Sequence, residues 1–332
     1  MWCGDPPEAT GEGKGFRFNF GGGGGADSAP VPSADSADAA TAAASEALIP
    51  GVEVLASEVP DPTPGWVPET VLVSDVPFVK GASSGARYAT VTDAVPDADE
   101  ARRSDLVKGK YEGGAKLWEG AMDLTRFLLE DEEASFVRLE KARVLELGCG
   151  HGLPGLACAM RGAGEVVLAD YNPDVLKTLT VPNARANGFL KGANENENGR
   201  RRESDPTFRF LGGDWASLAR SPALLEPGAF DVVLAAETVY EPSSFAKHID
   251  VLKRALKKPD GKTHLGETSR RGGAALVAAK SYYFGVGGGA RSFRARLERE
   301  GVFAVERVRT FSDGASNVRE ILKVTWAENG DG

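Results

Sequence analysis

The sequence contains few of the residues that hold disulfide-rich proteins and metal sites together. Its 332 residues include only three cysteines and three histidines. Cys3, Cys149 and Cys158 are too few and too unevenly spaced for a disulfide framework or a zinc site, which fits a reducing compartment. We expect the protein in the cytoplasm and the nucleus, with the nucleolus as an alternative. The histidines lie far apart in the sequence, so no metal is expected.

Long hydrophobic runs and an excess of basic residues are also missing. No stretch approaches the roughly 18 consecutive apolar residues of a membrane span, and the first residues lack the basic and apolar regions of a signal peptide. The net charge of −9 argues against direct binding to nucleic acid. It suits a basic protein partner, although acidity can also serve solubility alone.

Composition divides the chain into three parts. Residues 1–47 are dominated by Gly, Ala, Ser, Asp and Pro, so we expect a disordered tail, interrupted by the aromatic segment Phe16–Phe20. Residues 48–107 contain short β-prone pieces separated by prolines and predict a small accessory segment. Residues 108–328 alternate apolar strands with helices and predict one α/β domain with a largely parallel sheet.

A glycine loop at the start of this domain gives the first indication of function. The apolar run Val144–Leu147 is typical of a buried strand, and Leu153–Met160 reads as a helix of small residues. Between them, Gly148, Gly150 and Gly152 let the backbone turn sharply and a ligand approach it. A glycine-rich turn that only permits tight packing is the structural alternative.

Two acidic residues narrow the choice of ligand. Glu146 precedes Gly148 by two positions, and Asp170 ends the next apolar run, at a separation of 170 − 146 = 24. An acid about 20 residues after the loop is typical of ribose recognition in nucleotide-binding βαβ units. Glu146 would repel a pyrophosphate, but it suits the ammonium and sulfonium groups of S-adenosylmethionine (SAM). The loop, E-x-G-x-G-x-G, therefore favours SAM over a dinucleotide.

Acidic residues follow four of the expected strands. Because ligands bind beyond the carboxyl ends of parallel strands, we expect Glu146, Asp170, Asp214 and Glu237 to converge. Asp170 is predicted to hold the ribose, and Asp214 with Trp215 to border the adenine. Glu237 and Tyr240 are predicted beside the methyl group, and Lys280, Tyr282 and Tyr283 around the acceptor, with Gly287–Gly289 letting the substrate backbone approach.

With these residues, the chain resembles the seven-strand class I methyltransferases and, more narrowly, the eukaryotic histidine protein methyltransferases. Four stretches carry the resemblance: Tyr111–Glu119, Leu145–Gly152 with Asp170–Asn172, Glu237–Pro242, and Tyr283–Gly289. It implies a seven-stranded Rossmann-like sheet with helices on both faces. It also implies methylation of a histidine of large-subunit ribosomal protein three, on the ring nitrogen far from the main chain (tele). From the net charge and the lack of long apolar runs we expect no direct binding to nucleic acid or membrane.

The resemblance and the glycine loop together predict the cofactor-binding residues. These are Leu117, Trp118, Glu119, Gly120, Ala121, Glu146, Gly148, Gly150, Ala169, Asp170, Tyr171, Gly213, Asp214, Trp215 and Ala236. The chain departs from the family at His151 and Ala236, where a small hydroxyl residue is usual.

Glu237 and Tyr240 are the predicted catalytic residues. We expect one of them to accept a hydrogen bond from the second ring N–H of the acceptor histidine; the alternative is that Glu237 only orients SAM or caps a helix. The E-x-x-Y element also occurs in lysine methyltransferases of the same fold, which keeps a lysine acceptor open. A SAM-binding ribosome assembly factor that needs no turnover is the alternative outside the enzymes.

Overall fold

The computed structural model describes residues 48–82, 112–130, 137–190, 205–259, 272–312, 314 and 317–327. The expected tail, residues 1–47 with Phe16–Phe20, lies outside the described residues.

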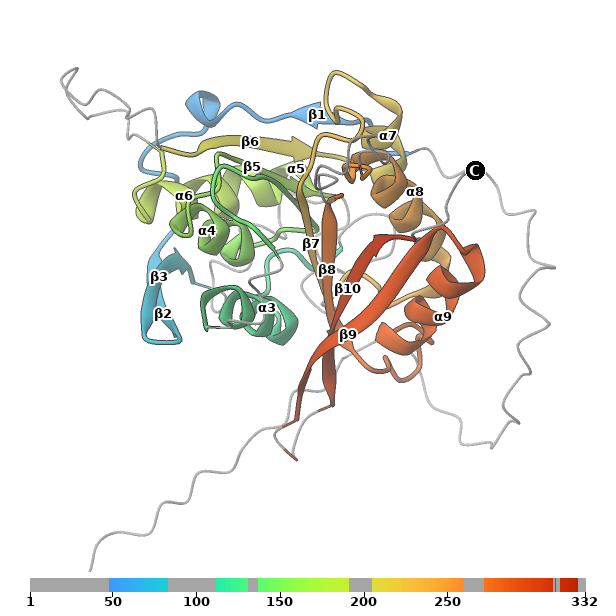
Figure 1. The fold of residues 1–332 in the computed structure, drawn as a ribbon. Coiled ribbons are helices and arrows are strands. Elements are labelled where there is room, and N and C mark those ends of the chain that lie inside the picture. Colours follow the sequence, from blue (N-terminus) through green and yellow to red (C-terminus); the bar gives the residue numbers. More distant parts are fainter. Residues whose placement is uncertain are drawn as a thin grey trace, which may run out of the picture.

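The domain is built on one twisted sheet with the strand order β1-β6-β5-β4-β7-β8-β10-β9 (Figure 1). In that order the strands are Val52–Glu53, Thr207–Gly212, Glu165–Asp170, Arg143–Leu147, Val232–Ala236, Ala274–Lys280, Arg319–Trp326 and Phe303–Phe311. The strands from β6 to β8 are parallel, and β10 and β9 complete the sheet in antiparallel orientation. The predicted seven-stranded sheet is thus confirmed, and the short edge strand β1, antiparallel to β6, adds an eighth.

Helices cover both faces of this sheet, as predicted (Figure 1). Because successive side chains of a strand point to opposite faces, β4 sends Val144 to one buried cluster and Leu145 and Leu147 to the other. One face carries α3 (Glu119–Glu130), α4 (Leu153–Met160) and α6 (Val181–Ala186); the other carries α7 (Trp215–Arg220), α8 (Phe245–Ala255) and α9 (Ala290–Glu300). No helix in the described ranges is long and apolar enough to cross a membrane.

The helix after β5 is irregular. It begins as α5 (Pro173–Val175), continues through a π-helical turn (Leu176–Thr180) and ends as α6. Pro182 comes just after the π-helical turn, and Thr180 and Val181 before it keep right-handed helical angles, so the chain continues into α6 without a break.

The β-prone pieces of the accessory segment form a hairpin, β2 (Pro68–Val73) and β3 (Val76–Gly81). Its turn residues, Ser74 and Asp75, have φ of 52° and 62°, the left-handed conformation that two-residue hairpin turns require. Asn187, at the end of α6, anchors the hairpin: its side chain accepts from the N–H of Val79 at 3.1 Å and donates to the carbonyl of Val79 at 2.6 Å.

Candidate functional site

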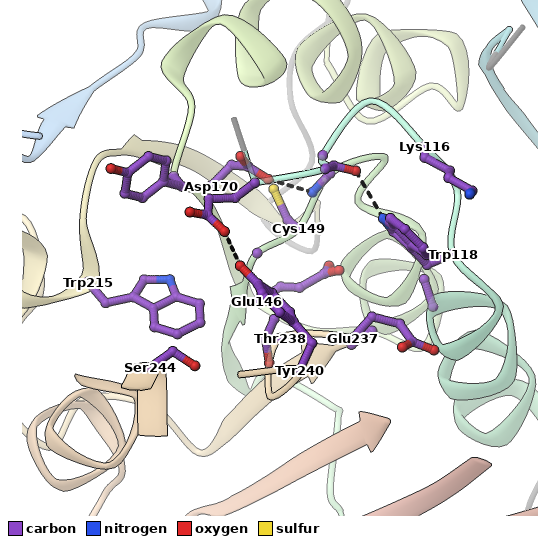
Figure 2. Close-up of a pocket in the computed structure, with 18 of the residues that line it drawn as sticks. Lys116, Trp118, Glu146, Cys149, Asp170, Trp215, Glu237, Thr238, Tyr240 and Ser244 are labelled. Atoms are coloured by element: carbon purple, nitrogen blue, oxygen red, sulfur yellow. Dashed lines mark hydrogen bonds between the residues drawn. The ribbon is translucent and has the colours of Figure 1, made fainter. Parts of the chain in front are cut away.

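A cavity of about 400 Å³ opens at the carboxyl ends of β4, β5 and β7 (Figure 2). Its volume falls in the range of about 300–1,000 Å³ that is usual for small-molecule sites. Trp215 and Ser244 lie at one side of the view, Trp118 and Glu237 at the other, and Asp170 between them. The predicted convergence of acids is present, because Glu146, Asp170, Asp214 and Glu237 all line this one cavity.

The glycine loop forms the floor of the cavity between β4 and α4. Gly148 and Gly150 have φ of 63° and 47°, a left-handed conformation that side chains with a Cβ rarely adopt. A Cβ on Gly150 would also lie 2.9 Å from the carbonyl oxygen of Gly114. Gly150 is therefore required for two reasons, its backbone angle and the close approach of residues 112–118 above it.

Asp170 and Glu146 hold this loop in place with their carboxylates. Asp170 accepts the N–H of Gly150 at 2.9 Å and the N–H of Asn172 at 3.0 Å. Glu146 accepts the N–H of Gly155, in the first turn of α4, at 2.7 Å. Burial raises the pKa of Asp170 to about 6 and that of Glu146 to about 8, the latter also because Asp170 lies near it. A cationic ligand would relieve this cost by pairing with the carboxylates.

Residues 112–118, here called the strap, cross over the cavity ahead of α3. Tyr240 donates a short hydrogen bond to the carboxylate of Glu112. The indole N–H of Trp118 donates to the carbonyl of Gly113 at 2.9 Å, which closes the strap on itself. The strap therefore connects the cofactor side of the cavity with the end of β7, where Tyr240 lies.

The turn after β6 forms one end of the cavity. Asp214 caps α7 by accepting the N–H of Ala216 at 2.8 Å, and its second oxygen accepts Lys247 Nζ at 2.7 Å. Trp215 presents its indole beside it, and in the described part of the chain its buried Nε1 has no hydrogen-bond partner. An aromatic ring with an unsatisfied buried donor fits an adenine, which offers a flat face for stacking and nitrogen acceptors.

Glu237 marks the opposite end and is held in a strained conformation. Its φ of 56° is left-handed, which costs a non-glycine residue roughly 1–2 kcal/mol. One carboxylate oxygen accepts the N–H of Gly120 at 3.1 Å, and the other accepts a short hydrogen bond from the Tyr283 hydroxyl. Burial raises the pKa of Glu237, although Tyr283 and the nearby cation Lys280 oppose this shift. Such strain is typical of functional positions.

Most of the predicted site residues line the cavity. They are Leu117, Trp118, Ala121, Glu146, Gly148, Gly150, Asp170, Tyr171, Asp214, Trp215, Ala236, Glu237 and Tyr240. Four others lie behind the lining and support it. Gly120 donates to Glu237, and Glu119 pairs with Lys280 at 3.5 Å. Ala169 accepts the N–H of Cys149, and Gly213 donates to the carbonyl of Asp170.

The loop after β8 differs from its predicted role. A Cβ on Gly288 would lie 2.2 Å from the backbone of Tyr240, and one on Gly289 would lie 2.5 Å from the carbonyl of Ser281. These two glycines thus let the chain's own backbone approach closely. Tyr283 lies behind Glu237, and the half-exposed Tyr282 receives a hydrogen bond from Arg291; neither lines the cavity.

Sequence reasoning missed several lining residues. Among the described residues these are Leu48, Glu112, Gly113, Gly114, Lys116, Cys149, His151, Thr238, Glu241, Ser243, Ser244 and Lys247. The strap residues belong to the Tyr111–Glu119 motif, so the motif itself was the signal. Leu48 lies far from every motif in the sequence, and only the fold brings it to the cavity. Lys247 follows the Glu237–Pro242 motif by five residues, in α8, but no pattern marked it.

Together, the 6-5-4-7-8-10-9 strand order, the glycine loop and the acidic cavity define the fold and cofactor cavity of the class I, SAM-dependent methyltransferases. A family model described as lysine methyltransferase matches residues 107–272, half of the chain, and the chain belongs to this family.

Curated relatives place the chain more narrowly. It is 36% identical over 223 residues to "Histidine protein methyltransferase 1 homolog" of Dictyostelium discoideum, covering 67% of this chain and 61% of the relative. The homolog of Rattus norvegicus is 33% identical over 235 residues, covering 67% and 59%. A "Protein N-terminal and lysine N-methyltransferase efm7" of Neurospora crassa is 31% identical over 153 residues, covering 44% and 49%. The predicted resemblance to histidine protein methyltransferases is confirmed, and the chain spans about three fifths of the length of those two relatives.

The raised pKa of Asp170 leads to a prediction for cofactor binding. An ionised Asp170 can accept two backbone N–H groups and ribose hydroxyls, whereas its protonated form loses acceptor capacity. Because its pKa is about 6, we expect SAM affinity to fall as the pH drops through 6, by about tenfold between pH 7 and pH 5. Titration calorimetry at both pH values measures this change.

Asp170→Asn is the control for this experiment. The amide does not titrate, so the variant should bind SAM weakly and with the same affinity at pH 7 and pH 5. Glu146, whose pKa is about 8, is already largely protonated at the upper end of this range in the free protein. An equal pH dependence in the variant would assign the effect to another group.

Proposed function

We propose that this protein transfers a methyl group from SAM to a histidine side chain of a protein, at the tele nitrogen. Its relatedness to curated histidine protein methyltransferases carries the proposal. A histidine of large-subunit ribosomal protein three, encountered in the cytoplasm or nucleus, is the proposed target. The acidic lining of the cavity and the net charge of −9 support a basic partner of this kind.

The acceptor end of the cavity has groups that can orient a neutral imidazole. Bound SAM supplies an electrophilic methyl group on its sulfonium. The imidazole, with an ordinary pKa of about 6.5, has a nucleophilic lone pair near pH 7 and needs no strong base. Because the Tyr240 proton is directed to Glu112, the Tyr240 oxygen can accept the remaining ring N–H and so select the tautomer.

Glu237 has a complementary part in this proposal. Its buried carboxylate lines the same cavity and is held by Gly120 and Tyr283, so it does not need to reorganise during the reaction. A fixed negative charge at this position would stabilise the imidazolium that forms as the methyl group is transferred.

A lysine acceptor is the second candidate, because the family description and the Neurospora crassa relative both refer to lysine. The two acceptors differ in their protonation. Lysine must lose a proton before it attacks, so its methylation rate should keep rising above pH 8, whereas a histidine acceptor should reach a plateau near pH 7.

The test is transfer of labelled methyl groups from SAM into ribosomal proteins, followed by mass spectrometry of the modified residue. We expect methylhistidine, with the label at the tele nitrogen. Methyllysine would replace the acceptor but keep the enzyme class. Tight SAM binding without any transfer would instead favour a role in ribosome assembly that requires no turnover.

A further inference from the structure

Residues 48–82 lie outside the region that the family model matches, yet they contact the cofactor cavity at two places. The first contact is direct. Leu48 lines the cavity, and the carbonyl of Ile49 accepts the N–H of Asp214 at 3.1 Å. A Cβ on Gly213 would lie 2.5 Å from the carbonyl oxygen of Pro50, so the two backbones pack closely at the turn beside Trp215.

The second contact is a chain of buried hydrogen bonds that begins in the accessory segment. Oδ1 of Asn183, in α6, accepts the indole N–H of Trp66 at 3.0 Å and the N–H of Gly81 at 2.8 Å. The Asn183 side-chain amide then donates to the carbonyl of His151 at 3.0 Å and lies 3.4 Å from His151 Nδ1. Asn183 is completely buried and has few alternative partners for these groups.

His151 extends this chain to the strap. Its Nε2 lies 3.0 Å from the carbonyl oxygen of Ala115, so Nε2 carries the proton and Nδ1 is the acceptor that faces Asn183. The ring is 2% exposed, and burial lowers its pKa to about 4, which keeps it in this neutral form at physiological pH. His151 itself lies in the glycine loop and lines the cavity.

We propose that residues 48–82 complete the SAM site, directly through Leu48 and indirectly through the hydrogen-bonded chain Trp66–Asn183–His151–Ala115, in which His151 is the positioning residue for the strap. The imidazole occupies the position where the family usually has a small hydroxyl. It spans from the glycine loop to Ala115 and holds the strap in the conformation that covers the cofactor. The inference rests on SAM binding alone and holds for either acceptor.

Two substitutions of His151 distinguish the roles of its two ring nitrogens, Nε2 and Nδ1. Glutamine places an amide donor near the position of Nε2 and can keep the bond to Ala115, whereas asparagine reaches only as far as Nδ1. In the full-length protein we expect His151→Asn to raise the Kd for SAM about tenfold, because the buried Ala115 carbonyl loses a donor. We expect His151→Gln to stay within about twofold of the unchanged protein, since this donor is retained. In His151→Asn the rise in the KM for SAM should be larger than the fall in kcat at saturating SAM, because the lost hydrogen bond acts first on cofactor binding.

Asn187→Ala is the matched control. Asn187 joins the same helix to the same hairpin strand through bonds to Val79, but no hydrogen bond connects its side chain to His151 in the described structure. Asn183→Ala should weaken SAM binding as His151→Asn does, and Asn187→Ala should not. Equal Kd values for the two His151 variants, or an equal loss of affinity in the two asparagine variants, would overturn the proposal.

A third variant applies if His151→Asn has no cooperative thermal unfolding transition. Trp66→Phe removes only the indole donor to Asn183 and keeps an aromatic ring in place. A measurable rise in its Kd for SAM supports the proposal, and an unchanged Kd contradicts it. If the unchanged protein binds SAM but methylates lysine, the proposed acceptor is wrong and this inference stands; if it does not bind SAM, both fail.

Discussion

Replacing Glu237 by glutamine is expected to lower kcat about 100-fold, the usual loss when one preorganised electrostatic group is removed from an active site. Glutamine has nearly the same shape, and its amide oxygen can still accept the N–H of Gly120. What it lacks is the charge opposite the developing imidazolium. Its amide NH2 also replaces the oxygen that accepts the Tyr283 hydroxyl, so this hydroxyl must turn and accept instead. The variant should unfold at a similar temperature and bind SAM with similar affinity. Single-turnover methyl transfer and titration calorimetry measure the two effects separately.

Tyr240→Phe is the companion to this experiment. It removes the hydroxyl that is bonded to Glu112 while keeping the ring that packs edge-on against Tyr283 at 6.4 Å. We expect a lower kcat with unchanged SAM affinity here as well. If the Kd of Glu237→Gln for SAM rises in proportion to its loss of kcat, Glu237 only orients SAM. Full activity in both Glu237→Gln and Tyr240→Phe would rule out the proposed roles.

Replacing Gly288 by alanine is expected to lower kcat/KM for the protein acceptor by about 100-fold, because displacements of about 1 Å in an active site have effects of this size. A Cβ at this position would lie 2.2 Å from the backbone of Tyr240, closer than atoms can approach, so the segment carrying Tyr240 must move. The clash does not involve the glycine loop, Asp170 or Trp215, so SAM binding should persist.

Gly285→Ala is the control for Gly288→Ala. Gly285 lies in the same loop with φ of 81°, but a Cβ there meets no atom within 4 Å. This variant has backbone strain without a clash, and we expect nearly normal methyl transfer. Equal activity of the two variants would show that the contact with Tyr240 does not determine the acceptor geometry.

The sequence was sufficient for those features that depend on neighbouring residues. The apolar period of Val144–Leu147, the small residues of Leu153–Met160 and the glycines between them are local patterns, and α4 has the predicted bounds. The acids at the strand ends were also predictable, because parallel strands bring their carboxyl ends to one edge of the sheet. The fold class, the cofactor and the acids that line the cavity follow from these patterns, whereas lining residues such as Leu117, Tyr171 and Ala236 were predicted from the family resemblance.

Other features depend on contacts between distant parts of the chain and leave no local pattern. Glu119, Gly120, Ala169 and Gly213 were predicted to bind the cofactor, but they lie behind the lining of the cavity and contact the residues that support it. Gly288 lies against the backbone of Tyr240, although the two residues are 48 positions apart in the sequence, since 288 − 240 = 48.

The accessory segment shows this division most clearly. Its β-prone pieces and prolines predicted short strands, which the hairpin and β1 contain. That Trp66 and Gly81 reach Asn183, more than 100 residues away, and through it His151, was decided by the packing of the hairpin on α6. A buried polar group must find its partner wherever the fold brings one within hydrogen-bond distance, and sequence spacing carries no information about that distance.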